Sequence, residues 1–388
     1  MDREYDIILF GASSFVGKTT ARYLHDNHPE LQVALAGRNE DKLKKLDLGL
    51  DIIVANAMDG EEMDEMAKQA RVIISTVGPY ARYGDKVVEA CAVNGTHYVD
   101  LCGEALFARR SIDKWHGLAQ ETGARIVHAC GFDSVPSDMG MFYLHEKAGV
   151  PLEKVTMAVE HLDGGFSGGT IDSVRELRED AQRMPNGQEL LRHPHTLSPD
   201  IASEPDLGEE PDLVVDNDEL VGQWVGPFFM ASFNTRIVRR SNSLLDHAYG
   251  SRLRYREASV AGGRLKAHLG RILTMAAFAA IMTPILRKPL SLFIPEPGDG
   301  PKDIDKGGFT IAHYGLGEDG SKHVTRVSAD GDPGYKVTAM MLAEAAVTLA
   351  TSPEGLPERA GVLTPATALG KPYLEALQSK GMRFSVES

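Results

Sequence analysis

The residues with the clearest chemical potential form a glycine-containing turn near the start of the chain. The segment Gly11-Ala-Ser-Ser-Phe-Val-Gly17 follows an apolar run and precedes a helical pattern. A turn of this kind directs the free N–H groups of a helix N-terminus at the pyrophosphate of a dinucleotide. Five of its residues are expected to bind the cofactor: Gly11, Ser13, Ser14, Phe15 and Gly17. Ser14 replaces the usual middle glycine; its hydroxyl can face a phosphate, although its side chain leaves less room for the backbone.

A cation follows the second strand expected in this unit. The run Gln32–Ala36 continues into Gly37 and Arg38, and no Asp or Glu occupies the strand tip. A guanidinium pairs with the 2′-phosphate of NADP, which a carboxylate would repel. The sequence therefore predicts NADP(H) in preference to NAD(H). The alternative is a strand-to-helix turn without a ligand, in which Arg38 is an ordinary surface charge.

Further candidates follow later apolar runs. Asp59 comes after the third run and can contact the adenine, while Thr76, Val77, Gly78 and Pro79 turn the chain after the fourth. In a parallel sheet, ligands lie outside the carboxyl ends of the strands, which places this second turn beside the nicotinamide ribose. A purely structural turn is the alternative. After the sixth run comes Gly131–Asp138, in which Ser134 and Pro136 suit the start of a helix.

The elements that must position these residues alternate along the first 150 residues. Apolar runs are separated by helical patterns, which predicts a doubly wound parallel sheet buried on both faces. The expected strands are Asp6–Phe10, Gln32–Ala36, Asp51–Ala55, Val72–Thr76, His97–Leu101 and Arg125–Ala129. The expected helices include Val16–Asn27, Glu61–Ala70, Asp85–Asn94 and Phe107–Thr122.

Beyond residue 150 the pattern indicates a mixed or antiparallel sheet. Its expected strands are Lys154–His161, Arg254–Ala261, Phe309–Gly315 and His323–Ala329, and a Gly-rich loop, 163–169, precedes a helix over Thr170–Arg183. A hairpin loop at Gly317–Gly320 and a helix over Tyr335–Thr351 complete this part.

Charge is unevenly distributed in this second part. Residues 200–220, here called the acidic loop, hold nine Asp or Glu and no Lys or Arg, which is typical of a solvated, mobile segment. Residues 236–288 instead hold eleven Lys or Arg and enclose the apolar run Ile272–Leu286. At fifteen residues, this run is too short for a confident membrane span, which needs about 18 or more. It is either a buried or pocket-lining helix or a membrane-surface helix.

Composition restricts the class of protein. A net charge of −14 argues against nonspecific nucleic-acid binding, and 388 residues suffice for two domains. The cysteines Cys91, Cys102 and Cys130 form no CxxC pattern and suggest free thiols. No cluster of ligand-type residues has metal spacing, so we expect no metal. Because Met1–Asp6 runs directly into the first strand, we expect no signal peptide and a cytoplasmic protein.

Taken together, these motifs resemble the saccharopine dehydrogenase-like NAD(P)-binding oxidoreductases. The resemblance is carried by Gly11–Gly17, Ala36–Arg38, Ser75-Thr-Val-Gly-Pro-Tyr80 and Gly131–Asp138. It is closest to the actinobacterial trans-acting enoyl reductase branch, which the segments Phe233–Asn242 and Gly361–Ala366 also resemble.

The resemblance implies a Rossmann domain made of residues 1–150 and 331–388, with an inserted α+β domain at 151–330. It further implies NADPH-dependent reduction of a carbon–carbon double bond in an acyl thioester. The reductase would act in trans for a polyketide or complex-lipid synthase, on a substrate carried by an acidic carrier protein. The apolar run Ile272–Leu286 and Phe228–Met230 could line an acyl groove. Arg239, Arg240 and Arg254 could offer the carrier a complementary surface.

Enoyl reduction requires donors for the thioester oxygen and a proton for the α-carbon. Tyr80 is the first candidate donor, followed by Tyr83 and Ser134. Asp133 could orient a donor or contact the nicotinamide ribose. His161 could face the site from the second domain. Each of these side chains could equally be structural.

Two other functions remain open. The first is an imine reductase acting on amino-acid conjugates, whose substrate carboxylates would need convergent Arg or Lys residues. The second is a non-catalytic NADPH-binding scaffold that associates with lipid or with the inner face of the membrane through Ile272–Leu286. The substrate that oxidises NADPH would distinguish the two reductases, and binding to lipid without turnover would indicate the scaffold.

Overall fold

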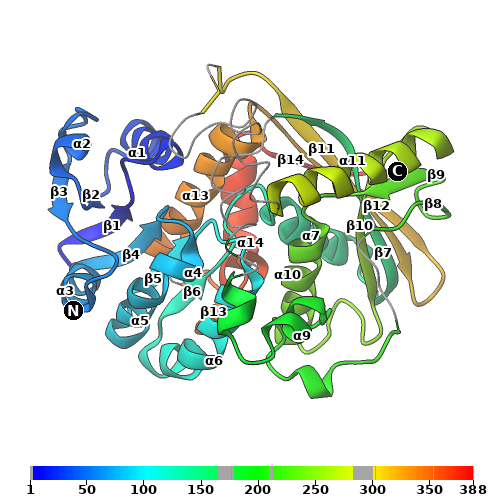
Figure 1. The fold of residues 1–388 in the computed structure, drawn as a ribbon, viewed down its shortest axis with the longest axis horizontal. Coiled ribbons are helices and arrows are strands. Elements are labelled where there is room, and N and C mark those ends of the chain that lie inside the picture. The colour runs from blue at the N-terminus through cyan, green and yellow to red at the C-terminus, as the bar shows by residue number, and fades with distance from the viewer. Residues whose placement is uncertain are drawn as a thin grey trace.

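Two sheets of seven strands each organise the part of the molecule that the structure describes. The computed structural model describes residues 3–164, 176, 179–208, 213–282, 300–301, 303–352 and 354–387. Figure 1 shows the first sheet on one side, the second on the other, and the C-terminal helices α13 (Thr338–Thr351) and α14 (Pro365–Ser379) between them. The predicted loop 163–169 and the helix expected over 170–183 fall largely outside the described residues.

The first sheet is parallel throughout and has the order β13-β6-β5-β4-β1-β2-β3. Its strands are β1 (Tyr5–Phe10), β2 (Val33–Gly37), β3 (Asp51–Val54), β4 (Ala70–Ser75), β5 (His97–Asp100), β6 (Arg125–Val127) and β13 (Gly361–Leu363). All six strands expected before residue 150 are confirmed. The strand order reverses between β1 and β4, and such a reversal is where open α/β sheets bind their ligands.

Alternating side chains in each central strand explain why helices cover both faces of this sheet. Ile7 and Leu9 of β1 are buried in one core and Ile8 and Phe10 in another. The first core contains residues of α1 (Phe15–Asn27), α7 (Val135–Ala148), α13 and α14, and the second contains residues of α3 (Gly60–Gln69), α5 (Asp85–Asn94) and α6 (Ala105–Thr122). The short helices α2 (Glu40–Lys44) and α4 (Tyr80–Tyr83) lie between strands and helices of the same domain. The doubly wound architecture is therefore confirmed.

The second sheet is mixed, with the order β14-β12-β11-β7-β10-β9-β8. Its strands are β7 (Leu152–Asp163), β8 (Asp216–Asp218), β9 (Gln223–Pro227), β10 (Arg254–Val260), β11 (Gly308–Gly317), β12 (Lys322–Asp330) and β14 (Arg383–Val386). Among these described strands, β7 and β10 pair in parallel and the other neighbours pair antiparallel. The four strands expected here are present. However, β14 comes from the C-terminal segment that the resemblance assigned to the first domain.

The remaining elements connect the sheets or lie over them. They are α9 (Gly187–Arg192), η1 (Ile201–Ser203), α10 (Ala231–Leu244), α11 (Arg264–Met282) and η3 (Pro333–Val337). The helix predicted over Tyr335–Thr351 corresponds to the end of η3 followed by α13.

The acidic loop is more ordered than its composition predicts. Strand β8 lies within it, and Asp218 is buried, where it accepts a hydrogen bond from the Thr156 hydroxyl at 2.8 Å. Asp216 and Asp218 both pair with Arg256 of β10. The prediction of a wholly solvated loop is therefore wrong, because an arginine distant in sequence neutralises part of its charge. Residues 209–212 lie outside the described residues.

The apolar run Ile272–Leu286 begins inside α11, and its described side chains are not buried. Ile272, Leu273 and Met275 are each more than half exposed. The buried-helix interpretation is thus wrong for these residues, while 283–286 lie outside the described residues. Among the helices that the structure describes, none has the length and apolarity required to cross a bilayer.

Candidate functional site at the carboxyl edge of the parallel sheet

The glycine turn is closed by contacts that leave no room for side chains. Gly11 has φ +89°, and a Cβ placed on it would lie 2.7 Å from Thr76 Oγ1. A Cβ on Gly17 would lie 2.4 Å from the carbonyl oxygen of Gly11. Both distances are far shorter than real Cβ contacts, so the backbones of β1 and α1 approach as closely as only glycine permits. This is the tight strand-to-helix turn that dinucleotide sites require.

Ser14 caps α1 within this turn. Its hydroxyl accepts a hydrogen bond from the Gly17 N–H at 2.9 Å and contacts Thr76 Oγ1 at 3.1 Å, and Thr76 Oγ1 donates to the Gly11 carbonyl at 2.9 Å. The cap leaves the backbone N–H groups of Ser13, Phe15 and Val16 without partners among the described residues. Free N–H groups at a helix N-terminus bind anions such as phosphate.

The other predicted cofactor residues surround the same edge of the sheet. Arg38 directly follows β2, is exposed, and makes no ion pair within the described part of the chain. Phe15 packs edge-on against Tyr335, with 4.8 Å between ring centroids. Asp59 caps α3 by accepting hydrogen bonds from the N–H groups of Glu61 and Glu62. Val77, Gly78 and Pro79 form the turn after β4, with a cis bond between Gly78 and Pro79.

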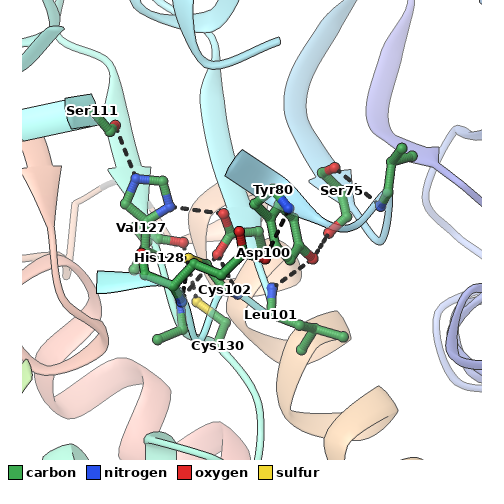
Figure 2. Close-up of polar contacts among 12 residues, drawn as sticks. Ser75, Tyr80, Asp100, Leu101, Cys102, Ser111, Val127, His128 and Cys130 are labelled. Carbon is green, nitrogen blue, oxygen red and sulfur yellow. Dashed lines mark hydrogen bonds and ion pairs between the residues drawn. The ribbon is translucent and has the colours of Figure 1, made fainter. Parts of the chain in front are cut away.

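The first-choice proton donor, Tyr80, is buried between two strand tips (Figure 2). Its hydroxyl donates to the Ser75 carbonyl at 2.9 Å and accepts from the Leu101 N–H at 3.1 Å. Burial raises the pKa of Tyr80 well above its usual value. In this arrangement the hydroxyl joins β4 to β5, and its donation to a substrate stays a prediction.

Two carboxylates that the sequence analysis did not select hold the same edge. Glu104 accepts the backbone N–H groups of Tyr80 at 2.9 Å and Ala81 at 2.7 Å. Asp100 accepts those of Cys102 at 2.9 Å and Ala129 at 3.0 Å. The sequence feature that could have identified them is an acidic residue at, or just beyond, the end of an apolar run.

The side chains of Ser111, His128 and Asp100 form a row of hydrogen bonds at the same edge. His128 bonds Asp100 at 2.7 Å and Ser111 at 2.9 Å (Figure 2). All three side chains are at most 2% exposed. A catalytic serine must reach its substrate, and Ser111 is buried. These three side chains therefore have a structural role and connect α6 to the ends of β5 and β6.

The predicted residues after β6 differ in their surroundings. Ser134 is buried and donates to the Asn234 side chain at 3.0 Å, which in turn donates to Glu257 at 3.0 Å. Asp133 is half-buried, and its carboxyl makes no hydrogen bond or ion pair with any described residue. Loss of solvation raises the pKa of Asp133 to about 7. A carboxyl with this pKa is partly protonated at neutral pH and can deliver a proton.

The remaining candidates are His161 and Tyr83. His161 is exposed on β7 opposite Thr310, and Tyr83 is half-buried at the end of α4. In the described part of the chain, no group of three or more His, Cys, Asp or Glu could hold a metal ion.

The arginines expected to face a carrier protein are mostly interior. Arg239 and Arg240 of α10 are buried and donate to backbone carbonyls, among them those of Tyr255, Leu197 and Val362. Arg254, by contrast, is exposed. The expectation is therefore wrong for Arg239 and Arg240, because a guanidinium enclosed among carbonyl groups presents no charge to a partner.

The fold and this edge together define a class of protein, the oxidoreductases that bind a nicotinamide dinucleotide on a parallel sheet. Residues 7–127 match the family model of the saccharopine dehydrogenase NADP binding domain. The fold of the whole chain is similar to that of apo saccharopine dehydrogenase (L-Glu forming) from Saccharomyces cerevisiae. The TM-score is 0.55 at 14% identity, over 99% of this chain and 100% of the other.

Similarity in sequence defines the family more narrowly. A Mycobacterium tuberculosis protein provisionally named a trans-acting enoyl reductase is 41% identical, over 98% of this chain and 97% of its own length. The trans-acting enoyl reductase of Mycobacterium ulcerans is 37% identical, over 99% of this chain and 98% of its own length. The chain therefore belongs to the trans-acting enoyl reductase family of saccharopine dehydrogenase-like proteins, and it is an NADP-dependent oxidoreductase.

The bridging geometry of Tyr80 generates a stability prediction. Tyr80→Phe leaves the partly buried N–H of Leu101 and the buried carbonyl of Ser75 without this partner, so we expect the free energy of unfolding to fall by about 2–3 kcal/mol. Denaturant unfolding measures the loss. Tyr143→Phe is the matched control, because within the described chain the hydroxyl of this buried tyrosine makes one hydrogen bond, which is long at 3.4 Å. If Tyr80→Phe instead unfolds like the wild type but loses turnover, the hydroxyl serves the substrate rather than the strands.

Proposed function

We propose that this protein reduces the carbon–carbon double bond of an enoyl thioester with NADPH, in trans, on an acyl chain carried by a polyketide or complex-lipid synthase. The observation that carries the proposal is identity of 37–41% to trans-acting enoyl reductases over nearly the full chain. The absence of space at Gly11 and Gly17 supports a pyrophosphate held against backbone. When bound, NADPH supplies the hydride that the β-carbon receives.

Three parts of the chain would hold the cofactor. The free N–H groups of Ser13, Phe15 and Val16 suit the pyrophosphate, since they carry the positive end of the α1 dipole. Arg38 suits the 2′-phosphate, because it follows β2 and has no partner within the described chain. The turn Thr76–Pro79 lies against the glycine turn through Thr76 and so flanks the ligand on its other side.

Asp133 supplies the proton in this proposal. Hydride addition at the β-carbon leaves negative charge on the thioester enolate, and a proton must then reach the α-carbon. The Asp133 carboxyl follows β6 at the same carboxyl edge, and its raised pKa of about 7 keeps part of it protonated at neutral pH. Ser134 and Tyr80 have hydroxyl groups committed to Asn234 and Ser75, so they position the edge rather than transfer the proton.

Positions of the arginines favour an enoyl thioester over an amino-acid conjugate. An imine reductase of this kind needs cations that converge on substrate carboxylates. Arg236, Arg239 and Arg240 are all buried and donate to backbone carbonyls instead. Among the arginines of residues 236–256, Arg252 and Arg254 are exposed and could contact an acidic carrier protein.

The reaction is tested by following NADPH absorbance with purified protein. We expect oxidation with an enoyl thioester of pantetheine, and faster oxidation when the same chain is attached to a carrier protein. Oxidation only with a 2-oxo acid plus an amine would overturn the proposal and support imine reduction. Binding of NADPH without turnover of either substrate would support the non-catalytic scaffold.

Cofactor preference depends on Arg38. We expect Arg38→Ala to weaken NADPH binding by about 1.5–3 kcal/mol, the scale of a charge-assisted hydrogen bond, with little change for NADH. Fluorescence titration with both coenzymes measures the two affinities. The control is Arg252→Ala, which removes an exposed arginine from the loop before β10. Equal losses for NADPH and NADH would contradict a specific contact with the 2′-phosphate.

Proton delivery depends on the protonated form of Asp133. Because the acid form is required, we expect kcat to fall as the pH rises through about 7. Asp133→Asn should lower kcat by roughly 10²–10⁴-fold and leave NADPH affinity within about threefold of wild type. Asp138→Asn is the matched control, since burial also raises the pKa of Asp138 to about 7, but its carboxyl is bonded to Ser241 and Ala366. Persistence of the same pH limb in Asp133→Asn would exclude this residue as the acid.

A further inference from the structure

Helix α11 has its large apolar side chains turned outward. Leu265 is 83% exposed, and Leu269, Ile272, Leu273 and Met275 are each more than half exposed. The side chain that faces inward is small: Ala267 is 1% exposed. Surface helices of globular proteins normally bury their leucines and present polar residues to water. The polarity of α11 is the reverse of this arrangement.

The helix is nevertheless held firmly to the second sheet. A Cβ on Gly226 of β9 would lie 3.3 Å from the backbone of Ala267, so helix and strand backbones are close. The Arg264 guanidinium lies 5.8 Å from the centre of the Trp224 ring, also on β9. Figure 1 shows α11 as a long helix at the side of the molecule occupied by this sheet. The outward apolar face therefore follows from how the helix is attached.

The charges of α11 all have one sign. Arg264, Lys266 and Arg271 lie in its first half, and residues 264–282 contain no Asp or Glu. At 100° per residue, Lys266 lies on one side of the row formed by Leu265, Leu269 and Ile272, while Arg264 and Arg271 lie on the other. The apolar row is thus flanked by cations on both sides, although the whole chain has a net charge of −14.

From this arrangement we propose that α11 binds the surface of an anionic bilayer, parallel to it, with the row Leu265, Leu269 and Ile272 in the acyl boundary. Apolar side chains between flanking cations, without acids, are the pattern of interfacial helices. The cations would contact lipid phosphates while their stems stay in the apolar layer. A second copy of α11 fits poorly, because its cations would face those of the first.

A protein partner also fits less well than a bilayer. A helix docked on another helix buries a stripe on one side, about 100° wide. The exposed apolar residues of α11 extend from Met275 through Leu265 to Leu273, which is about 160° of the helix at 100° per residue. A bilayer covers such a wide face without needing complementary polar groups. The inference is independent of the reaction proposed above.

Flotation of the full-length protein with vesicles tests the inference. Vesicles of equal parts phosphatidylglycerol and phosphatidylcholine are compared with vesicles of phosphatidylcholine alone. We expect the wild type to float with the anionic vesicles, and binding to weaken as salt is raised. Leu265→Gln/Ile272→Gln should lower the partition coefficient about tenfold or more. Lys266→Glu/Arg271→Glu should abolish the preference for anionic lipid.

The control is Val93→Gln/Val386→Gln, which removes two valines that are about half exposed from other parts of the surface. This control should float like the wild type, and all variants should bind NADPH equally. The inference is overturned if the wild type does not float with either vesicle, or if the control loses as much binding as the α11 variant. It is also overturned if the wild type is a dimer in lipid-free solution and Leu265→Gln/Ile272→Gln makes it a monomer without any vesicle binding. Loss of turnover only with carrier-bound substrate, in a protein that does not float, would instead identify α11 as a carrier-docking surface.

Discussion

Buried carboxylates supply the hydrogen bonds that the strand tips of the first sheet lack. Beyond its last ladder bond, a strand has backbone N–H groups that must find acceptors or remain unpaired at a cost of about 1–3 kcal/mol each. Asp100 and Glu104 accept four of these groups, from the turns after β4, β5 and β6. The turn Thr76–Pro79, the glycine turn it touches through Thr76, and the segment after β6 thereby keep fixed positions. The carboxyl edge of the first sheet therefore depends on Asp100 and Glu104 as hydrogen-bond acceptors.

Much of the fold follows from periodicity, and the site is only partly predictable. Six apolar runs punctuated by Gly, Asn and Asp predict the parallel sheet, because such runs have few alternatives once helical patterns separate them. The glycine turn is predictable for the same reason: close approach of two backbones excludes other residues. The bond that Tyr80 makes to Ser75 and Leu101 is not predictable, because it depends on the spacing of two strand tips that meet only in the folded chain.

The distribution of charged residues along the sequence is a poor guide to which of them lie on the surface of the folded protein. Arg240 of α10 is 2% exposed, and burial lowers its pKa to about 9. It remains cationic at neutral pH because carbonyl oxygens of Leu197 and Val362 replace water around its guanidinium. Asp218 is buried against Arg256 in the same way. In both cases a charge that composition assigns to the surface instead joins segments distant in sequence.

The carboxyl groups at this edge of the sheet differ in their hydrogen bonds within the described chain. Asp100 and Glu104 each have backbone N–H partners, whereas Asp133 has none among the described residues. Its pKa is raised from 3.8 to about 7, so its contribution to stability is complete below about pH 4 and is lost as the pH rises through about 7. At neutral pH the folded protein therefore carries a carboxyl that reduces stability. No hydrogen bond within the described chain offsets this loss, which is why we propose Asp133 as the residue that holds a proton for the substrate.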